Sequence, residues 1–66
     1  MESEVIIPIN REILRLLIKG LNHKEIGKEV SLSRTKVENI LKEMRDHFHV
    51  KTNLELIKIL SKADII

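Results

Sequence analysis

The fold is decided by the stretch from Asn22 to Phe48, NHKEIGKEVSLSRTKVENILKEMRDHF. Its first part contains a helix N-cap, because the Asn22 side chain can accept from the Glu25 N–H while the Glu25 side chain reaches back to the Asn22 N–H. A second N-cap stands at Ser33. The apolar residues after Ser33 recur at spacings of three and four, which puts them on one stripe of a helix. They are Val37, Ile40, Leu41, Met44 and Phe48.

The segment between these two predicted helices, residues 30–33, is too short for more than a steep reversal of the chain. Two helices joined by a turn of three or four residues form the layout of a helix-turn-helix. The second helix of that motif can enter the major groove of DNA. The stretch therefore predicts helices at about 23–30 and 34–48 in this arrangement.

Length and composition narrow the possible classes of protein. Sixty-six residues allow one domain over 1–66, with 1–5 as a frayed acidic lead. There is no cysteine and a single aromatic residue, so the core must be aliphatic. A net charge of +2 is too small to indicate nucleic-acid binding by itself. No apolar run approaches the roughly 20 residues that span a bilayer. The first residues do not show a basic segment followed by a long apolar one, so we expect no secretion. We therefore expect a cytoplasmic protein without a membrane contact.

The flanking segments predict one helix on each side. Pro8 suits the first position of a helix at about 8–19, which Gly20 ends in the left-handed conformation. The apolar residues of this helix form a broad surface, which suits a central position in the fold. They are Ile9, Ile13, Leu14, Leu16, Leu17 and Ile18. Thr52 and Glu55 form a capping box for a fourth helix at 53–62. Gly27 is a poor helix former, and its expected compensation is close backbone approach between the second and third helices.

The fourth predicted helix is apolar over more than half its circumference. A chain this short cannot cover both sides of such a helix, so part of it is expected to contact a second copy or another domain. The residues predicted for this dimer interface are Leu56, Ile59 and Ala63. The predicted fold class is all-α, a four-helix bundle-like helix-turn-helix domain with helices at about 8–19, 23–30, 34–48 and 53–62.

From about Pro8 to Leu60 the sequence resembles the LuxR-type (GerE-like) helix-turn-helix domain. The matching residues align without a gap. They are Glu12-Ile13-Leu14, Leu16-Leu17, Gly20 to Gly27, Leu32-Ser33, Val37, Met44, Phe48, Val50, Asn53 and Glu55. The resemblance implies the output domain of a bacterial transcription regulator, such as a response regulator. It further implies a third helix in the major groove, a homodimer through the fourth helix, and an N-terminal receiver or sensor domain outside this chain.

Some positions depart from the family's pattern. Ile7, Ile9 and Asn10 replace the usual polar cap of the first helix, and Lys36 replaces a threonine that usually binds phosphate. Glu38 replaces a lysine that usually faces DNA. His49 replaces a common glycine, so it is strained if its φ stays positive.

Helical geometry places a polar face opposite the Val37–Phe48 stripe. The residues predicted to face DNA bases are Thr35, Glu38, Asn39 and Lys42. Asn39 suits adenine N6/N7, Lys42 can reach guanine O6/N7, and Glu38 can accept from cytosine N4. The residues predicted to contact phosphate are Lys24, Ser33, Arg34, Lys36 and Lys51. The alternative interpretation is a solvated face, with Arg34 and Glu38 as an ordinary ion pair across one helical turn.

Other functions have less support in the sequence. His47 and His49, with Glu43 one turn earlier, suggest a zinc site, but no cysteine or fourth converging ligand completes it. We predict no metal, no cofactor and no catalytic residue, since no nucleophile or carboxylate pair stands in a pocket-like context. The alternative to double-stranded DNA binding is an adaptor domain that binds proteins with the same fold. The modest net charge and Glu38 motivate that alternative.

Overall fold

The computed structural model describes residues 7–66, which form four helices and no strand. These are α1 (Pro8–Ile18), α2 (His23–Val30), α3 (Arg34–His47) and α4 (Asn53–Lys62). The all-α class is confirmed, and α1 and α3 each end one residue earlier than expected. The frayed lead expected over residues 1–5 lies outside the described residues. None of the four helices combines the length and the apolar character needed to cross a bilayer.

The N-caps expected from the sequence set where the later helices begin. The Asn22 side chain accepts from the Glu25 N–H and the Glu25 side chain accepts from the Asn22 N–H, both at 2.9 Å. Ser33 Oγ accepts from the Lys36 N–H at 3.0 Å. Thr52 Oγ1 accepts from the Glu55 N–H at 3.1 Å, which is one half of the expected capping box. Local sequence thus fixes the start of α2, α3 and α4.

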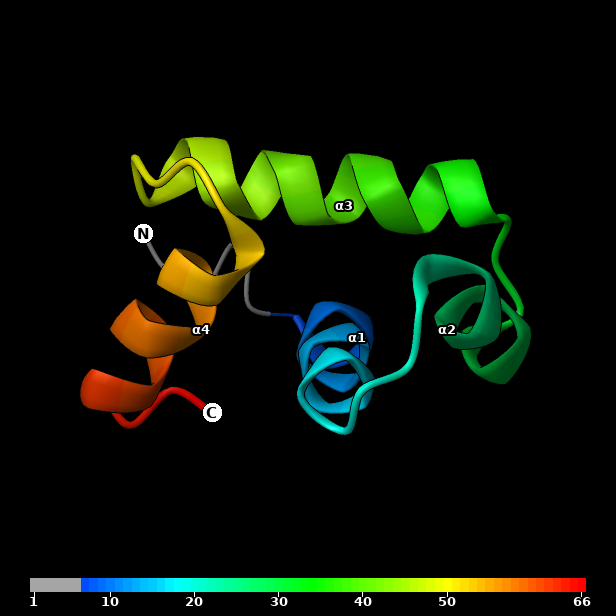
Figure 1. Ribbon diagram of the computed structural model, residues 1–66, viewed down its shortest axis with the longest axis horizontal. Helices are drawn as coiled ribbons and strands as arrows, with labels where there is room; N and C mark the ends of the chain where they lie inside the picture. Colours follow the sequence, from blue (N-terminus) through cyan, green and yellow to red (C-terminus); the bar gives the residue numbers. More distant parts are fainter. Residues whose placement is uncertain (1–6) are drawn as a thin grey trace.

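Helix α3 lies across the other three helices (Figure 1). In that view α4, α1 and α2 follow one another beneath it, and no helix lies above it. All four helices contribute side chains to one aliphatic core. Its buried members are Ile13, Leu14, Leu16, Ile26, Val37, Leu41, Met44, Leu56 and Leu60. One side of α3 therefore packs on the core and the opposite side stays free of the other helices.

Residues with a left-handed backbone conformation stand just after the helices. Gly20 has φ +100° after α1, as expected, but Ser31, His49 and Asp64 have φ values of +59°, +56° and +58°. At His49 the Val50 N–H donates to the Arg45 carbonyl at 3.0 Å, which closes the end of α3. The φ of His49 is thus positive, which is the condition under which the sequence predicts strain there. A non-glycine residue in this conformation is strained by roughly 1–2 kcal/mol.

Gly27 allows the turn between α2 and α3 to approach closely. A Cβ at Gly27 would stand 2.5 Å from the carbonyl oxygen of Leu32. The Leu32 N–H donates to the Gly27 carbonyl at 2.9 Å, so a hydrogen bond holds the two backbone segments together at this point. The expected close approach is confirmed, although its partner is the turn rather than α3 itself.

Two expectations about the apolar faces were wrong. In α1, Ile9 and Ile18 stand at the ends of the helix and remain exposed, while Asn10 is buried with 6% exposure. No buried side-chain nitrogen or oxygen within residues 7–66 lacks a hydrogen-bond partner. In α4, Leu56 is fully buried in the core of its own chain, so it cannot belong to the dimer interface predicted for it. Ile59 and Ala63 of that predicted interface are exposed.

Candidate nucleic-acid interface

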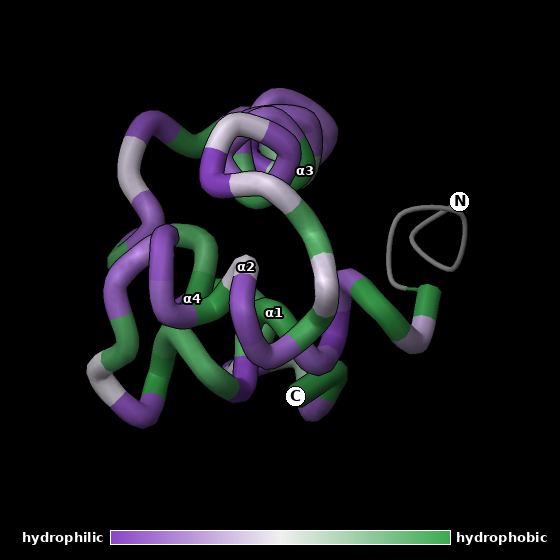
Figure 2. Tube along the Cα trace, turned by 90° about the vertical axis from the view of Figure 1, so that its right-hand side faces the viewer, coloured by the Kyte–Doolittle hydropathy of each residue, from purple (hydrophilic) through white to green (hydrophobic). Residues whose placement is uncertain are grey.

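The outer side of α3 is polar along its length. Thr35, Asn39 and Lys42 are exposed, on the side opposite the buried Val37 and Leu41. Figure 2 shows hydrophilic residues on the outer turns of α3 and hydrophobic ones turned toward the other helices. Three of the four side chains predicted to face bases thus project from a surface that no other helix covers. The fourth, Glu38, is half-buried.

The residues predicted to contact phosphate surround this face. Lys24 lies in the first turn of α2, Arg34 and Lys36 lie in the first turn of α3, and Lys51 lies in the segment between α3 and α4. All four side chains are exposed. Ser33 is also exposed, but its hydroxyl oxygen already accepts the Lys36 N–H as the cap of α3. The cap uses the hydroxyl oxygen of Ser33 as an acceptor and does not engage its O–H as a donor.

Glu38 is held by two neighbours at the start of this face. His23 Nδ1 lies 3.3 Å from Glu38 Oε1, and Arg34 Nε donates to the same oxygen at 3.3 Å. The hydrogen bonds from His23 and then from Arg34 hold the pKa of the Glu38 carboxyl below its ordinary value. The ion pair between Arg34 and Glu38 was expected from their spacing. His23, fifteen residues away on α2, was not.

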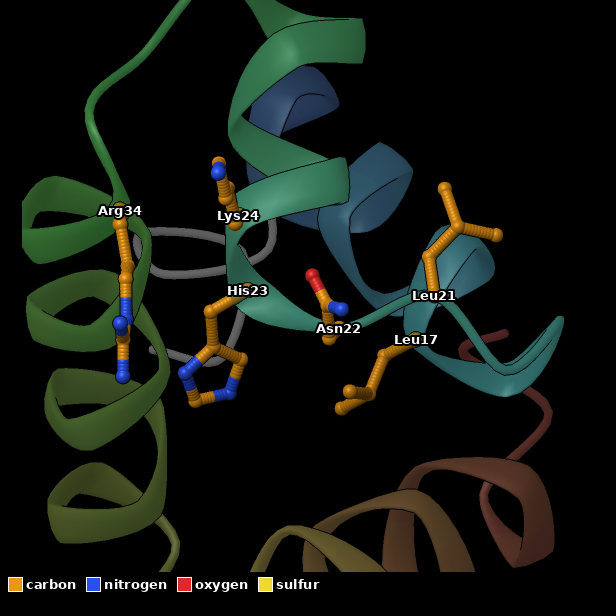
Figure 3. A pocket seen from close by; sticks show the side chains of 6 residues that line it. All are labelled: Leu17, Leu21, Asn22, His23, Lys24 and Arg34. Carbon is orange, nitrogen blue, oxygen red and sulfur yellow. The ribbon is translucent and has the colours of Figure 1, made fainter.

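A cleft of about 430 Å³ lies beside this cluster. It runs between α1, the start of α2 and the start of α3 (Figure 3). Its lining is apolar on the α1 side and cationic or polar elsewhere. The lining residues are Leu17, Leu21, Asn22, His23, Lys24 and Arg34. Figure 3 shows the His23 ring and the Arg34 side chain next to each other, with Lys24 turned away from both.

Residues 9–60 match the sequence model of the GerE family, described as bacterial regulatory proteins of the luxR family. The chain belongs to the LuxR family. Neither a curated protein nor a solved structure matches the chain. Membership of the LuxR family indicates a DNA-binding regulator of transcription rather than an enzyme.

The LuxR-family domain also has a contact that fixes α4 relative to α3. Arg45 Nη1 donates to the Asn53 side-chain oxygen, which joins the last turn of α3 to the first residue of α4. Both residues are half-buried. No pattern in the sequence predicts this contact between Arg45 and Asn53. The contact matters because α4 then holds a defined orientation relative to the outer face of α3.

The histidines weighed as zinc ligands stand at the other end of α3. The rings of His47 and Phe48 contact each other edge to face, with centroids 4.9 Å apart. Within residues 7–66, no three side chains of the kinds that bind metal ions lie close enough to share one. His47 and His49 are both exposed and lie apart from the cluster formed by His23, Arg34 and Glu38.

Proposed function

We propose that this LuxR-family domain binds double-stranded DNA in a sequence-specific way, with α3 in the major groove. The observation that carries the proposal is the uncovered polar side of α3, where Thr35, Asn39 and Lys42 are exposed together. A helix of 14 residues is about 21 Å long. The major groove of B-DNA is wide enough to admit an α-helix, one side of which then faces the base edges.

The residue types on this face suit base edges. The Asn39 amide can form a paired hydrogen bond with adenine N6 and N7, and Lys42 can donate to guanine O6 and N7. Thr35, one turn before Asn39, can contact either a base or a phosphate, because its hydroxyl both donates and accepts. Asn39 and Lys42 are three residues apart, so they project on the same side of α3.

The cations around α3 are proposed to fix the domain on the sugar–phosphate backbone. Lys24 stands where the free N–H groups and the positive dipole end of α2 also attract an anion. Arg34 and Lys36 stand at the corresponding end of α3, and Lys51 at the opposite end. Phosphate contacts of this type supply affinity and orientation, and the base contacts supply specificity.

We propose a homodimer that forms through the exposed apolar part of α4. Ile59 is 39% exposed and Ala63 lies one turn later on the same side, whereas Leu56 is excluded by its burial. Ile59→Glu should weaken self-association in analytical ultracentrifugation without unfolding the monomer. Leu54→Glu is the matched control, because Leu54 is 64% exposed but lies about 140° around α4 from Ile59. Equal dimer affinity in the Ile59→Glu variant and the wild type would remove Ile59 from the interface.

The same proposal places the domain in a larger regulator. As a response-regulator output domain it would receive its signal from an N-terminal receiver or sensor domain, and it would act in the bacterial cytoplasm. This part of the proposal is supported by family membership alone.

The proposed function is tested by the binding of duplex DNA at several salt concentrations. The affinity should fall as salt rises, with a log–log slope of about −0.9 for each phosphate neutralised. Selection of duplexes from a random pool should return a preferred half-site and, for a dimer, a twofold repeat of it. Absence of any complex at low salt would favour the adaptor function instead. The observation that favours the adaptor function is the acidic Glu38, which lies on the same helix as the proposed base contacts.

A further inference from the structure

Glu38 is the one acidic side chain among residues 34–42 of α3, and the way in which it is held suggests a use. Both of its neighbours contact the same oxygen, Oε1. Its other oxygen, Oε2, accepts no hydrogen bond from any side chain or backbone group of residues 7–66. A carboxylate fixed through one oxygen keeps the second as an acceptor of defined position.

The position of Glu38 on α3 puts that free acceptor beside the proposed base contacts. Glu38 precedes Asn39 directly and stands four residues before Lys42, so Glu38 and Lys42 lie on one side of the helix. Among the base edges in the major groove, the cytosine N4 amino group is the donor that an acidic side chain reads. The repulsion between a carboxylate and the phosphates is offset here by the two donors on Oε1.

We propose that His23 is a positioning residue for sequence readout, which together with Arg34 holds Glu38 so that its free oxygen accepts from a cytosine N4 at one position of the DNA site. This inference rests on the proposed function. His23 comes from the first residue of α2, so it couples the orientation of the Glu38 side chain to the packing of α2 against α3. Arg34 alone, one turn away on the same helix, leaves the carboxylate free to rotate around a single contact.

The surroundings of His23 leave Glu38 as its acidic partner. From α1 and the loop after it Leu17, Leu21 and Asn22 line the cleft at His23, none of them charged. From α2 Lys24 lines it, and α3 contributes Arg34 to the cleft and Glu38 to the contact with His23. Glu38 is therefore the one acidic group that faces His23 within the described part of the chain.

The experiment measures competition among four duplexes that differ only at the base pair where Glu38→Gln relaxes the wild-type preference. The wild type should prefer cytosine there by about fivefold or more, the lower end of what one base contact provides. His23→Ala should reduce the preference to about twofold or less at that base pair and leave the other positions unchanged. Circular dichroism checks that each variant is folded.

A conservative variant separates positioning from a merely structural role. His23→Asn places an amide nitrogen near the site of Nδ1, so it should keep the cytosine preference that His23→Ala loses. His47→Asn, at an exposed histidine away from the cluster, should keep the cytosine preference of the wild type.

The outcomes distinguish this inference from the proposed function. A wild-type chain that selects no sequence would overturn the proposed function, and the inference with it. Specific binding in which Glu38→Gln relaxes no position, or in which His23→Ala keeps the full cytosine preference, would overturn the inference alone. The same holds if His23→Asn loses the cytosine preference as fully as His23→Ala does.

Discussion

Truncation of Leu60 to alanine should remove a large part of the stability of the domain. Leu60 lies in α4 with no exposed surface, in contact with the aliphatic core. Removing a buried leucine side chain beyond Cβ costs about 2–5 kcal/mol, the sum of lost transfer free energy and the cavity left behind. At about 0.05–0.15 kcal/mol per residue, a chain of 66 residues has a total stability of roughly 3–10 kcal/mol. Leu60→Ala should therefore leave the domain marginally folded or unfolded.

Ile59→Ala is the matched control, because Ile59 directly precedes Leu60 on the same helix but is 39% exposed. It should cost about 1 kcal/mol or less, as expected for a substitution outside the core. The assay is urea unfolding followed by far-ultraviolet circular dichroism at low protein concentration, where self-association does not contribute. A loss of about 3 kcal/mol corresponds to a fall in Tm of roughly 12–24 °C for a domain of this size.

Equal losses for the two alanine variants would refute this reasoning. Such a result would mean that α4 does not turn Leu60 inward and Ile59 outward. The packing of α4 on the core, and the proposed place of Ile59 in a dimer, would then both be wrong.

Four further predictions follow from single positions. Lys42→Ala should weaken specific DNA binding by about 1–3 kcal/mol and relax one base preference, whereas an equal loss on random DNA would make Lys42 a phosphate contact. Gly27→Val should destabilise the domain by about 1–3 kcal/mol in urea unfolding, because its Cβ would stand 2.5 Å from the Leu32 carbonyl oxygen, and an unchanged midpoint would argue against that contact. His49→Gly should raise the stability by about 1 kcal/mol, because it relieves a positive φ, and a loss of stability would show that the strain is absent. The pKa of Glu38 is lowered, so its contribution to stability is present above the ordinary carboxyl pKa of about 4.3 and is lost as the pH falls through the folded-state pKa. Glu38→Gln should flatten that part of the acid-unfolding profile, and an unchanged profile would contradict it.

The sequence predicted the centre of this fold well because the signals there are local. The caps at Asn22 and Ser33 each depend on a residue three positions away, and both form. The buried stripe of α3 follows from helical spacing alone, and its central residues Val37 and Leu41 are fully buried. Local hydrogen bonding and periodicity thus define two helices and the turn that joins them.

Periodicity was less informative where a helix is apolar on most of its surface. In α4 the apolar residues surround more than half of the helix, so spacing could not separate Leu56, which packs inward, from Ile59, which does not. That choice depends on how α4 lies against α3 and α1. In α1 the burial of Asn10 does follow the spacing, since it stands three and four residues before Ile13 and Leu14. The polar side chain of Asn10, however, does not by itself indicate burial.

The candidate site was predictable in part for a similar reason. The exposed positions of Thr35, Asn39 and Lys42 follow from the helix stripe opposite them. The contact between His23 and Glu38 joins two helices across fifteen residues of sequence, and no periodic pattern encodes it. Only the packing of α2 against α3 brings the two side chains within 3.3 Å.

The central claim, that the uncovered side of α3 is the DNA-binding surface, is tested most directly by nuclear magnetic resonance. Duplex DNA from the selection is titrated into labelled protein, and the backbone amide shifts are followed. The claim predicts the largest changes at Thr35, Asn39 and Lys42, with smaller ones at Lys24 and Lys51. Unchanged shifts at the three α3 residues, together with changes on another surface, would contradict it.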